Sequence, residues 1–293
     1  MEFFRPTSWL DALAVKAAHP GALPIAGGTD VMVGINFGRL RPLALLDLTM
    51  IGELADWARD GDDIVLGAGV PYARVISELA GPLPGLAIAS RTVGSPQIRA
   101  RGTVGGNLGS ASPAGDAHPP LLACGAEVEA ESVRGTRRIR ACDFFAGVKR
   151  TALAPDELIR AIRIPVARGP QQFAKVGTRN AMVIAVSSFA LALHPDRERA
   201  GTGIGSAAPT PRTAARAAEF LSAELADGGL WESRGRLPES AAARFGDLVA
   251  EASEPIDDVR GSAAYRRHSL AVLARRTLGW AWQQYQQEGS RCA

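Results

Sequence analysis

Two glycine-rich segments hold the residues of this sequence whose types and spacing are best suited to chemistry. They are AGGTD at 26–30 and TVGGNLG at 103–109. In both, a threonine stands close to paired glycines, which leave backbone N–H groups uncovered and able to bind an anion. Paired glycines also occur in ordinary turns, so neither segment is specific alone. The first segment matches neither the G-x-G-x-x-G of dinucleotide-binding folds nor the G-x-x-x-x-G-K-[ST] of a P-loop.

The separation of the two segments makes a shared role more specific. About 75 residues lie between them, and each follows a short apolar or helical stretch. We therefore expect two subdomains to bring the segments together around one pyrophosphate, to which both would donate N–H groups. A dinucleotide of the FAD kind has two phosphates and fits this arrangement.

Asp116 is the acidic residue placed to complete such a site. It lies nine residues after Asn107 in RGTVGGNLGSASPAGDAHP (101–119), a stretch short of bulky side chains. Its carboxylate can accept hydrogen bonds from a ribose or a ring edge of the nucleotide. The alternative role is that of a turn-capping aspartate.

Charge and cysteine content disfavour several other functions. The 33 basic and 30 acidic residues give a net charge of +3, too small and too evenly mixed to predict nucleic acid or an anionic membrane as the main partner. Cys124, Cys142 and Cys292 are too widely spaced for a disulfide framework or for a zinc or iron–sulfur ligand set, so we expect reduced thiols. The four histidines lack ligand spacing, which predicts that this chain binds no metal.

No part of the sequence has the pattern of a membrane anchor or an export signal. No stretch approaches the roughly 18 apolar residues of a transmembrane helix. The N-terminus also lacks a basic region followed by an apolar run. We therefore expect a soluble cytoplasmic protein.

The elements that must position these residues are both helices and strands, and 293 residues suffice for two domains. A cap at Thr7 or Ser8 and a stop at Pro20-Gly21 predict a helix between them. Apolar runs and turn residues predict strands at 22–28, 43–48, 62–70 and 156–165, a strand pair joined across Arg134-Gly135, a helix at 71–81, and helical spacing over 83–102 that breaks at Gly94-Ser95-Pro96.

The sequence pattern changes around VARGPQQ (166–172), which predicts a domain boundary near residue 170. Beyond it, QFAKVGTRNAMVIAVSSFALALHP has a Gly-Arg turn and then an apolar run that is a core strand or helix. GTGIGSAAPTPRTAARAAEFLSAELADGG predicts a glycine-rich strand or loop, a turn and an alanine-rich helix. SAAYRRHSLAVLARRTLGWAWQQYQQ has the amphipathic pattern of a terminal helix.

Five motifs taken in order resemble one family. They are PIAGGTDVMV, GSPQIRARGTVGGNLGSASPAGDAHPPLLACGAEVE, KVGTRNAMVIAV, GSAAPTPRTA and SAAYRRHSLAVLARRT. Together they resemble the FAD-binding medium subunits of the molybdenum hydroxylases, in particular the bacterial xanthine dehydrogenase type, to which the carbon monoxide dehydrogenase medium subunit is related. The likeness runs from about Phe4 to about Arg276 and is specific as an ordered set.

The resemblance implies an α+β fold. Residues 1–170 would form a two-subdomain FAD-binding domain of the vanillyl-alcohol oxidase (PCMH) type, with subdomains of about 1–57 and 58–170. Residues 171–285 would form a smaller α+β C-terminal domain like that of carbon monoxide dehydrogenase flavoproteins, and 286–293 a tail. The implied boundary agrees with the change of pattern near residue 170.

The resemblance also implies which residues bind FAD. Lys175, one of only three lysines, matches a flavin-contacting position where a cation balances charge on the reduced flavin, the alternative being a solvated surface lysine. We expect noncovalent FAD, because neither segment has a linking His or Cys and His118 lies where the family has no attachment. The implied cofactor-binding residues are Pro24, Ile25, Ala26, Gly27, Gly28, Thr29, Asp30, Val31, Thr103, Val104, Gly105, Gly106, Asn107, Asp116, Leu158, Ile159 and Lys175.

Arg179 and Val183, which both follow Lys175 in the sequence, concern the electron acceptor. The guanidinium fork of Arg179 suits a nucleotide phosphate or a partner carboxylate, so Arg179 is a candidate NAD or partner contact. Val183 stands four positions later, where relatives often have an acidic residue. This departure leaves the acceptor open.

The implied function is electron transfer, with no catalytic residue in this chain. A partner large subunit with a molybdenum cofactor would hydroxylate a purine such as xanthine. A small subunit with [2Fe–2S] clusters would deliver electrons to FAD and then NAD, in a dimer of heterotrimers. The alternatives are a carbon monoxide, nicotine or aldehyde dehydrogenase complex, or an assembly subunit without flavin. A stand-alone oxidase lacks an acid/base pair in a matching motif.

Overall fold

The first part of the chain is built on a small parallel sheet. The computed structural model describes residues 1–290, with side chains as far as Glu288. The strands pair in the order β1 (Glu2–Phe4), β3 (Ala44–Asp47), β2 (Leu23–Ile25). The predicted helix is α1 (Trp9–Ala18), which begins after Ser8, whose hydroxyl accepts a hydrogen bond from the Asp11 backbone N–H. The predicted strands at 22–28 and 43–48 are confirmed as β2 and β3, and a short helix, α2 (Val31–Asn36), follows β2.

A larger antiparallel sheet follows. Its strand order is β4 (Trp57–Asp60), β5 (Asp63–Gly67), β10 (Leu158–Pro165), β6 (Glu127–Ser132), β7 (Gly135–Arg140). Buried and half-exposed residues alternate along β6, as expected for a strand with one face on a core. The predicted strands at 62–70 and 156–165 and the predicted strand pair are confirmed. A hairpin of β8 (Phe145–Gly147) and β9 (Arg150–Thr151) and the 3-10 helices η1 (Gly52–Leu54) and η2 (Ala141–Asp143) complete this part.

Five helices lie between β5 and β6 in the chain. They are α3 (Tyr72–Glu78), α4 (Pro84–Arg91), α5 (Pro96–Arg101), α6 (Val104–Ser110) and α7 (His118–Cys124). The predicted break at Gly94-Ser95-Pro96 separates α4 from α5, and Ser95 caps α5 through its hydroxyl. The helix predicted at 71–81 is α3.

The second glycine segment differs from the prediction, because its core is helical rather than a loop. Thr103 caps α6, and its hydroxyl accepts a hydrogen bond from the Gly106 backbone N–H (2.8 Å). A Cβ atom on Gly105 would lie 2.5 Å from the carbonyl oxygen of Ala68. Position 105 therefore requires glycine because α6 packs directly against the end of β5.

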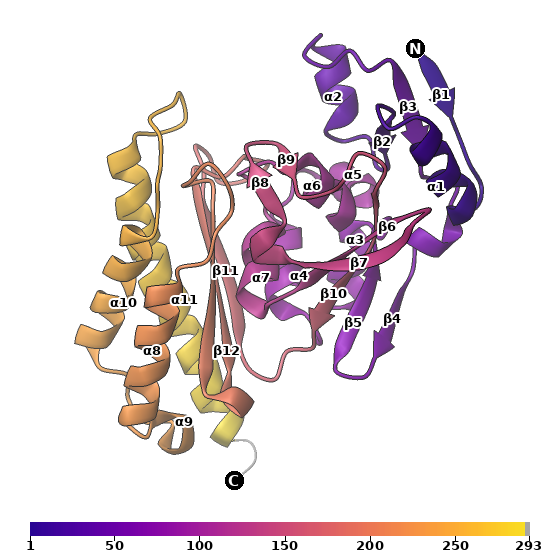
Figure 1. Cartoon of the computed structure of the whole chain (residues 1–293). Coiled ribbons are helices and arrows are strands. Elements are labelled where there is room, and N and C mark those ends of the chain that lie inside the picture. Colours follow the sequence, from indigo (N-terminus) through magenta and orange to yellow (C-terminus); the bar gives the residue numbers. More distant parts are fainter. Residues whose placement is uncertain (291–293) are drawn as a thin grey trace.

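The remainder of the chain forms a three-stranded antiparallel sheet covered by helices (Figure 1). The apolar run after the Gly-Arg turn contains a strand at Ser187–His194, which pairs with a neighbouring strand on each side, and its β-branched residues Val183, Ile184 and Val186 precede that strand. The elements are β11 (Gln171–Val176), β12 (Ser187–His194), η3 (Pro195–Arg197), β13 (Arg199–Gly205), α8 (Ala215–Asp227), α9 (Leu230–Ser233), α10 (Glu239–Glu251) and α11 (Ala263–Ser290).

The glycines of β13 allow the two parts of the chain to touch. A Cβ atom on Gly201 would collide with the carbonyl oxygen of Ala123, and one on Gly203 with that of Pro119. Helix α7 therefore lies directly on β13, with backbone against backbone. The glycine-rich stretch is a strand whose composition is set by this close approach.

Two hydrophobic cores serve the two parts. The first core runs in sequence from Trp9 to Ile164, and the second from Phe189 to Tyr285. A small apolar cluster around Phe173, with Ala89 and Ala190 among its members, lies between them. The cores lie on either side of residue 170, but the exact domain limits stay a prediction.

The chain ends in a long helix. Helix α11 continues to Ser290 and so enters the segment 286–293 that was expected to be a tail; Cys292 lies outside the described residues. Cys124 and Cys142 are free thiols. Over residues 1–290 no helix is long and apolar enough to cross a membrane, and in that range no three His, Cys, Asp or Glu side chains gather as metal ligands would.

Candidate functional site

The two glycine segments lie side by side. A Cβ atom on Gly27 would collide with the carbonyl oxygen of Arg101, at the end of α5. A Cβ atom on Gly102 would lie 3.2 Å from Oγ1 of Thr29. The contact at Gly27 requires glycine, and both contacts place residues 26–30 against residues 101–102, immediately before the second segment, as the spacing predicted.

The first segment leaves its donors uncommitted. Among the described residues, no protein group accepts a hydrogen bond from the backbone N–H groups of Ala26 to Asp30. Gly28 has φ +73°, a left-handed conformation that favours glycine and turns the chain between β2 and α2. Uncommitted N–H groups in a half-exposed turn suit an anionic ligand. Pro24 and Ile25 end β2, and Val31 begins α2, so all three flank this turn.

The second segment has one buried and one open glycine. Gly105 is buried against Ala68, as described above. Gly106 is exposed, and a Cβ atom there would approach only Oγ1 of Thr103, at 3.0 Å. Within 103–107, the open space therefore lies beside Gly106, while Thr103 and Val104 are buried under it.

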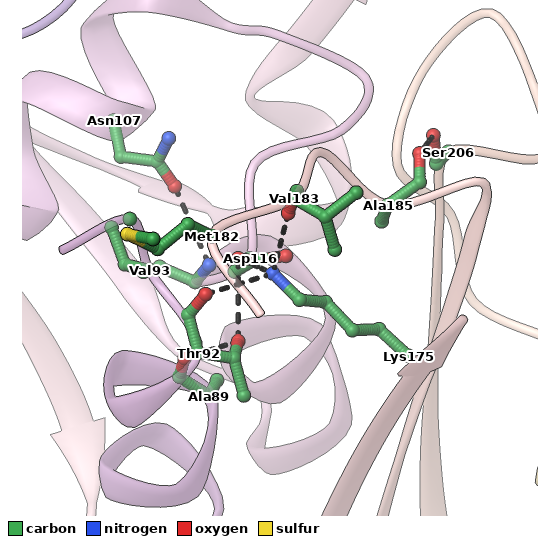
Figure 2. Close-up of polar contacts among 12 residues, drawn as sticks. Ala89, Thr92, Val93, Asn107, Asp116, Lys175, Met182, Val183, Ala185 and Ser206 are labelled. Carbon is green, nitrogen blue, oxygen red and sulfur yellow. Dashed lines mark hydrogen bonds and ion pairs between the residues drawn. The ribbon is translucent and has the colours of Figure 1, made fainter. Parts of the chain in front are cut away.

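Asp116 and Lys175 form a buried ion pair that joins the two parts of the chain (Figure 2). Nζ of Lys175 lies 2.5 Å from Oδ2 of Asp116, and 8% and 9% of the two side chains are exposed. The same ammonium donates to the carbonyl oxygens of Thr92 (3.0 Å) and Val183 (3.1 Å). Asp116 thus does not cap a turn with this oxygen, and Lys175 is not a solvated surface lysine.

The second carboxylate oxygen of Asp116 has no partner. Oδ1 is buried, and no group in residues 1–288 donates a hydrogen bond to it. Burial raises the pKa of Asp116, and the charge and hydrogen bond of Lys175 oppose this rise. A buried, unsatisfied acceptor is costly, so a donor such as a hydroxyl or ring N–H of a bound ligand would satisfy it.

The loop between β11 and β12 is anchored so that Val183 can reach Lys175. The Ser206 hydroxyl donates to the carbonyl oxygen of Ala185 (2.6 Å), as Figure 2 shows. The buried guanidinium of Arg266 in α11 donates to the carbonyl oxygens of Val186 (2.5 Å) and Ser206 (2.6 Å). Helix α11 therefore helps to fix the part of the site that comes from the second half of the chain.

The other predicted residues lie at the margin of this arrangement. Leu158 and Ile159 are buried at the start of β10, and Ile159 lies under α6, within 4 Å of a Cβ atom on Gly109. Oδ1 of Asn107 accepts a hydrogen bond from the backbone N–H of Ala117, with 3.4 Å between the nitrogen and the oxygen. The exposed guanidinium of Arg179 donates to the carbonyl oxygens of Ala181 and Met182 in its own loop.

His118 is close to the site but is a core residue. Its ring is fully buried and packs against Phe145, with ring centroids 4.7 Å apart. Burial lowers the pKa of His118 to about 3. The imidazole is therefore neutral at physiological pH.

Sequence reasoning missed the backbone partners of Lys175. The carbonyl groups of Thr92 and Val183 carry no side-chain signal, so no residue type marks them. Position was the available signal: Thr92 is the C-cap of α4, two residues before the predicted break, where helix carbonyl groups are free.

A bound FAD fits the residues that are present. The site combines uncommitted N–H groups in residues 26–30, an open glycine at 106, and a buried carboxylate with one free oxygen beside a lysine. The N–H groups and the open glycine suit phosphates, and the carboxylate beside the lysine suits a polar group such as a hydroxyl or a flavin ring edge.

The chain belongs to a flavoprotein family. Residues 1–167 match the family described as the FAD-binding domain in molybdopterin dehydrogenase, so this chain is a member of that family and an oxidoreductase subunit of the molybdenum hydroxylase class. It is 31% identical over 290 residues to the carbon monoxide dehydrogenase medium chain of Afipia carboxidovorans, covering 94% of this chain and 95% of that protein.

Two further comparisons agree. The putative xanthine dehydrogenase FAD-binding subunit of Escherichia coli K12 is 29% identical over 221 residues, which cover 71% of this chain and 75% of that protein. The solved structure of a Cu,Mo-containing CO dehydrogenase in its cyanide-inactivated form superposes with a TM-score of 0.88 at 30% identity, covering 97% and 98% of the two chains. The family resemblance and the α+β FAD-binding fold predicted from the sequence are confirmed.

Proposed function

We propose that this chain binds FAD noncovalently at the site of residues 26–30, 103–107, Asp116 and Lys175, and passes electrons from a [2Fe–2S] partner subunit to NAD. Oxidation of the substrate would take place at a molybdenum cofactor in another partner subunit. The observation that carries the proposal is the buried Lys175–Asp116 pair with its one unsatisfied carboxylate oxygen, together with the free N–H groups of the turn at 26–30.

Each group of residues has a distinct task in this proposal. Bound FAD supplies a ring that exchanges one or two electrons. The N–H groups of 26–30 and the open space at Gly106 hold the pyrophosphate. Lys175 places a positive charge where negative charge develops on reduction, and Asp116 keeps that ammonium in position. No residue of this chain acts as an acid or base toward the substrate that the partner subunit oxidises.

The surface beside the first segment supports the presence of a partner subunit. None of the residues of α2 is buried, although four of its six are Val, Met or Ile. The residues that follow include Phe37, 71% exposed, and Leu43, 87% exposed. An apolar surface of this kind is typical of a protein interface.

The substrate of the complex is either xanthine or carbon monoxide in this proposal. Xanthine was the substrate predicted from the sequence, with carbon monoxide among the alternatives. The carbon monoxide dehydrogenase relative covers nearly the whole chain, while the xanthine dehydrogenase relative covers 71% of it. Carbon monoxide therefore has at least equal support. Assay of the purified complex with each substrate separates the two.

Titration of the purified chain with FAD tests cofactor binding. We expect quenching of flavin fluorescence with one site per chain, and release of intact FAD on acid precipitation. Gly106→Val should weaken binding at least tenfold with little loss of stability, because its side chain would fill the open space beside Thr103.

The control variant is Gly52→Val. Gly52 is exposed with no atom near its Cβ position, so this change should leave FAD affinity unaltered. Gly105 is unsuitable for the test because any side chain there strikes Ala68. A folded wild-type chain that takes up no FAD would favour the assembly-subunit alternative instead.

A further inference from the structure

Tyr72 is a buried tyrosine whose hydroxyl group has no partner. It is the first residue of α3, and 3% of its surface is exposed. No group in residues 1–288 forms a hydrogen bond with its Oη atom. The other buried tyrosine, Tyr285, donates to the carbonyl oxygen of Trp231 (2.7 Å). Buried hydroxyl groups are nearly always paired, so the lone hydroxyl of Tyr72 indicates a partner from outside the chain.

The ring of Tyr72 lies where the two glycine segments meet. Its backbone N–H donates to the carbonyl oxygen of Gly102 (3.0 Å). A Cβ atom on Gly102 would lie 3.5 Å from ring carbon Cδ2 of Tyr72 and 3.2 Å from Oγ1 of Thr29. Tyr72 and Thr29 therefore approach the same glycine, at the contact between the segments that we assign to the pyrophosphate.

A second unpaired buried atom belongs to the same site. Oδ1 of Asp116 lacks a donor, as Oη of Tyr72 lacks an acceptor. Burial and, to a smaller extent, the negative charge of Asp116 raise the pKa of Tyr72, so the phenol keeps its proton and can donate. A ligand that offers both an acceptor and a donor would satisfy both atoms, and FAD carries phosphate oxygens, ribityl hydroxyls and a ring N–H.

We propose that the Tyr72 hydroxyl donates a hydrogen bond to an oxygen atom of bound FAD, which makes Tyr72 a cofactor-binding residue outside both glycine segments. This inference rests on the proposed FAD function. It also predicts opposite effects of the Tyr72 hydroxyl with and without FAD. In the apoprotein the hydroxyl is unpaired and lowers the stability of the fold, whereas in the holoprotein it is paired with FAD and raises that stability.

The test is Tyr72→Phe in the full chain, which removes only the hydroxyl. We expect FAD affinity to fall about tenfold, the effect of one lost hydrogen bond. The melting temperature of the apoprotein should stay the same or rise, and the increase in melting temperature on adding FAD should shrink. Fluorescence titration and thermal unfolding with and without FAD measure these quantities.

Tyr285→Phe is the matched control, because it removes a buried hydroxyl that is paired within the protein. It should lower the melting temperature with and without FAD and leave affinity unchanged. Equal affinity of Tyr72→Phe and wild type, or a less stable or unfolded Tyr72→Phe apoprotein, would overturn the inference, since the hydroxyl would then serve the apoprotein itself. Failure of the wild type to bind FAD would instead overturn the proposed function.

Discussion

His118 shows at the scale of one residue how burial controls ionisation next to the candidate site. Its folded-state pKa of about 3 is below that of an unfolded histidine, so between about pH 3 and 6.5 the unfolded chain binds more protons. Stability should therefore fall as pH decreases through this range, by up to about 1.4 kcal/mol per pH unit. His118→Leu should remove this part of the slope, whereas the exposed His268→Leu should keep it. Urea unfolding from pH 4 to 7 measures both, and an unchanged slope in His118→Leu contradicts the assignment.

Single residues also mark the limit of what the sequence could reveal about the site. Glycine pairs, an isolated aspartate and a rare lysine are visible as residue types, and Asp116 and Lys175 do come together. The carbonyl groups of Thr92 and Val183 and the unpaired state of Tyr72 depend on distances across the fold. Such distances arise from packing, which one sequence does not encode locally.

At the scale of elements, strands and helices with clear apolar spacing were predictable, and contacts between them were not. The hairpin of β6 and β7 and the break between α4 and α5 follow from local turn residues. The sequence left the role of the glycines in α6 and β13 ambiguous, because glycine permits either an open loop or a close approach of two backbones. Gly105 and Gly203 belong to the second case.

The contact of α7 with β13 leads to a prediction for Gly203→Ala. The added methyl group would strike the Pro119 carbonyl, and the backbone at that point yields little, so stability should fall by about 1–3 kcal/mol. FAD affinity should fall too, because Asp116 lies two residues before the start of α7. Gly279→Ala in α11 has free space and should instead stabilise by about 1 kcal/mol. Denaturant unfolding and FAD titration of both variants check this, and a stable Gly203→Ala would show that α7 can move away.

At the scale of the whole molecule, the candidate site belongs to neither half alone. Asp116 comes from the part with the first core, and Lys175 from β11, after the predicted boundary at 170. Figure 1 shows the β11–β13 sheet between the first half and the helices α8, α10 and α11. The second half therefore supplies the positive charge of the site, while the first supplies its carboxylate and its N–H donors.

The α2 segment, residues 31–43, follows the first glycine turn directly in the chain, and none of the residues of α2 itself is buried. A partner docked there would lie close to the cofactor, as electron transfer requires.

The double variant Phe37→Glu, Leu43→Glu should abolish co-purification of the [2Fe–2S] subunit. Both side chains are exposed, and the change would replace their apolar contact with the partner by buried charge. FAD content and melting temperature of the isolated chain should stay unchanged. Trp280→Glu, also exposed but on α11, is the control and should retain the partner. Retention of the partner by the double variant, measured by size-exclusion chromatography and iron content, would place the interface elsewhere.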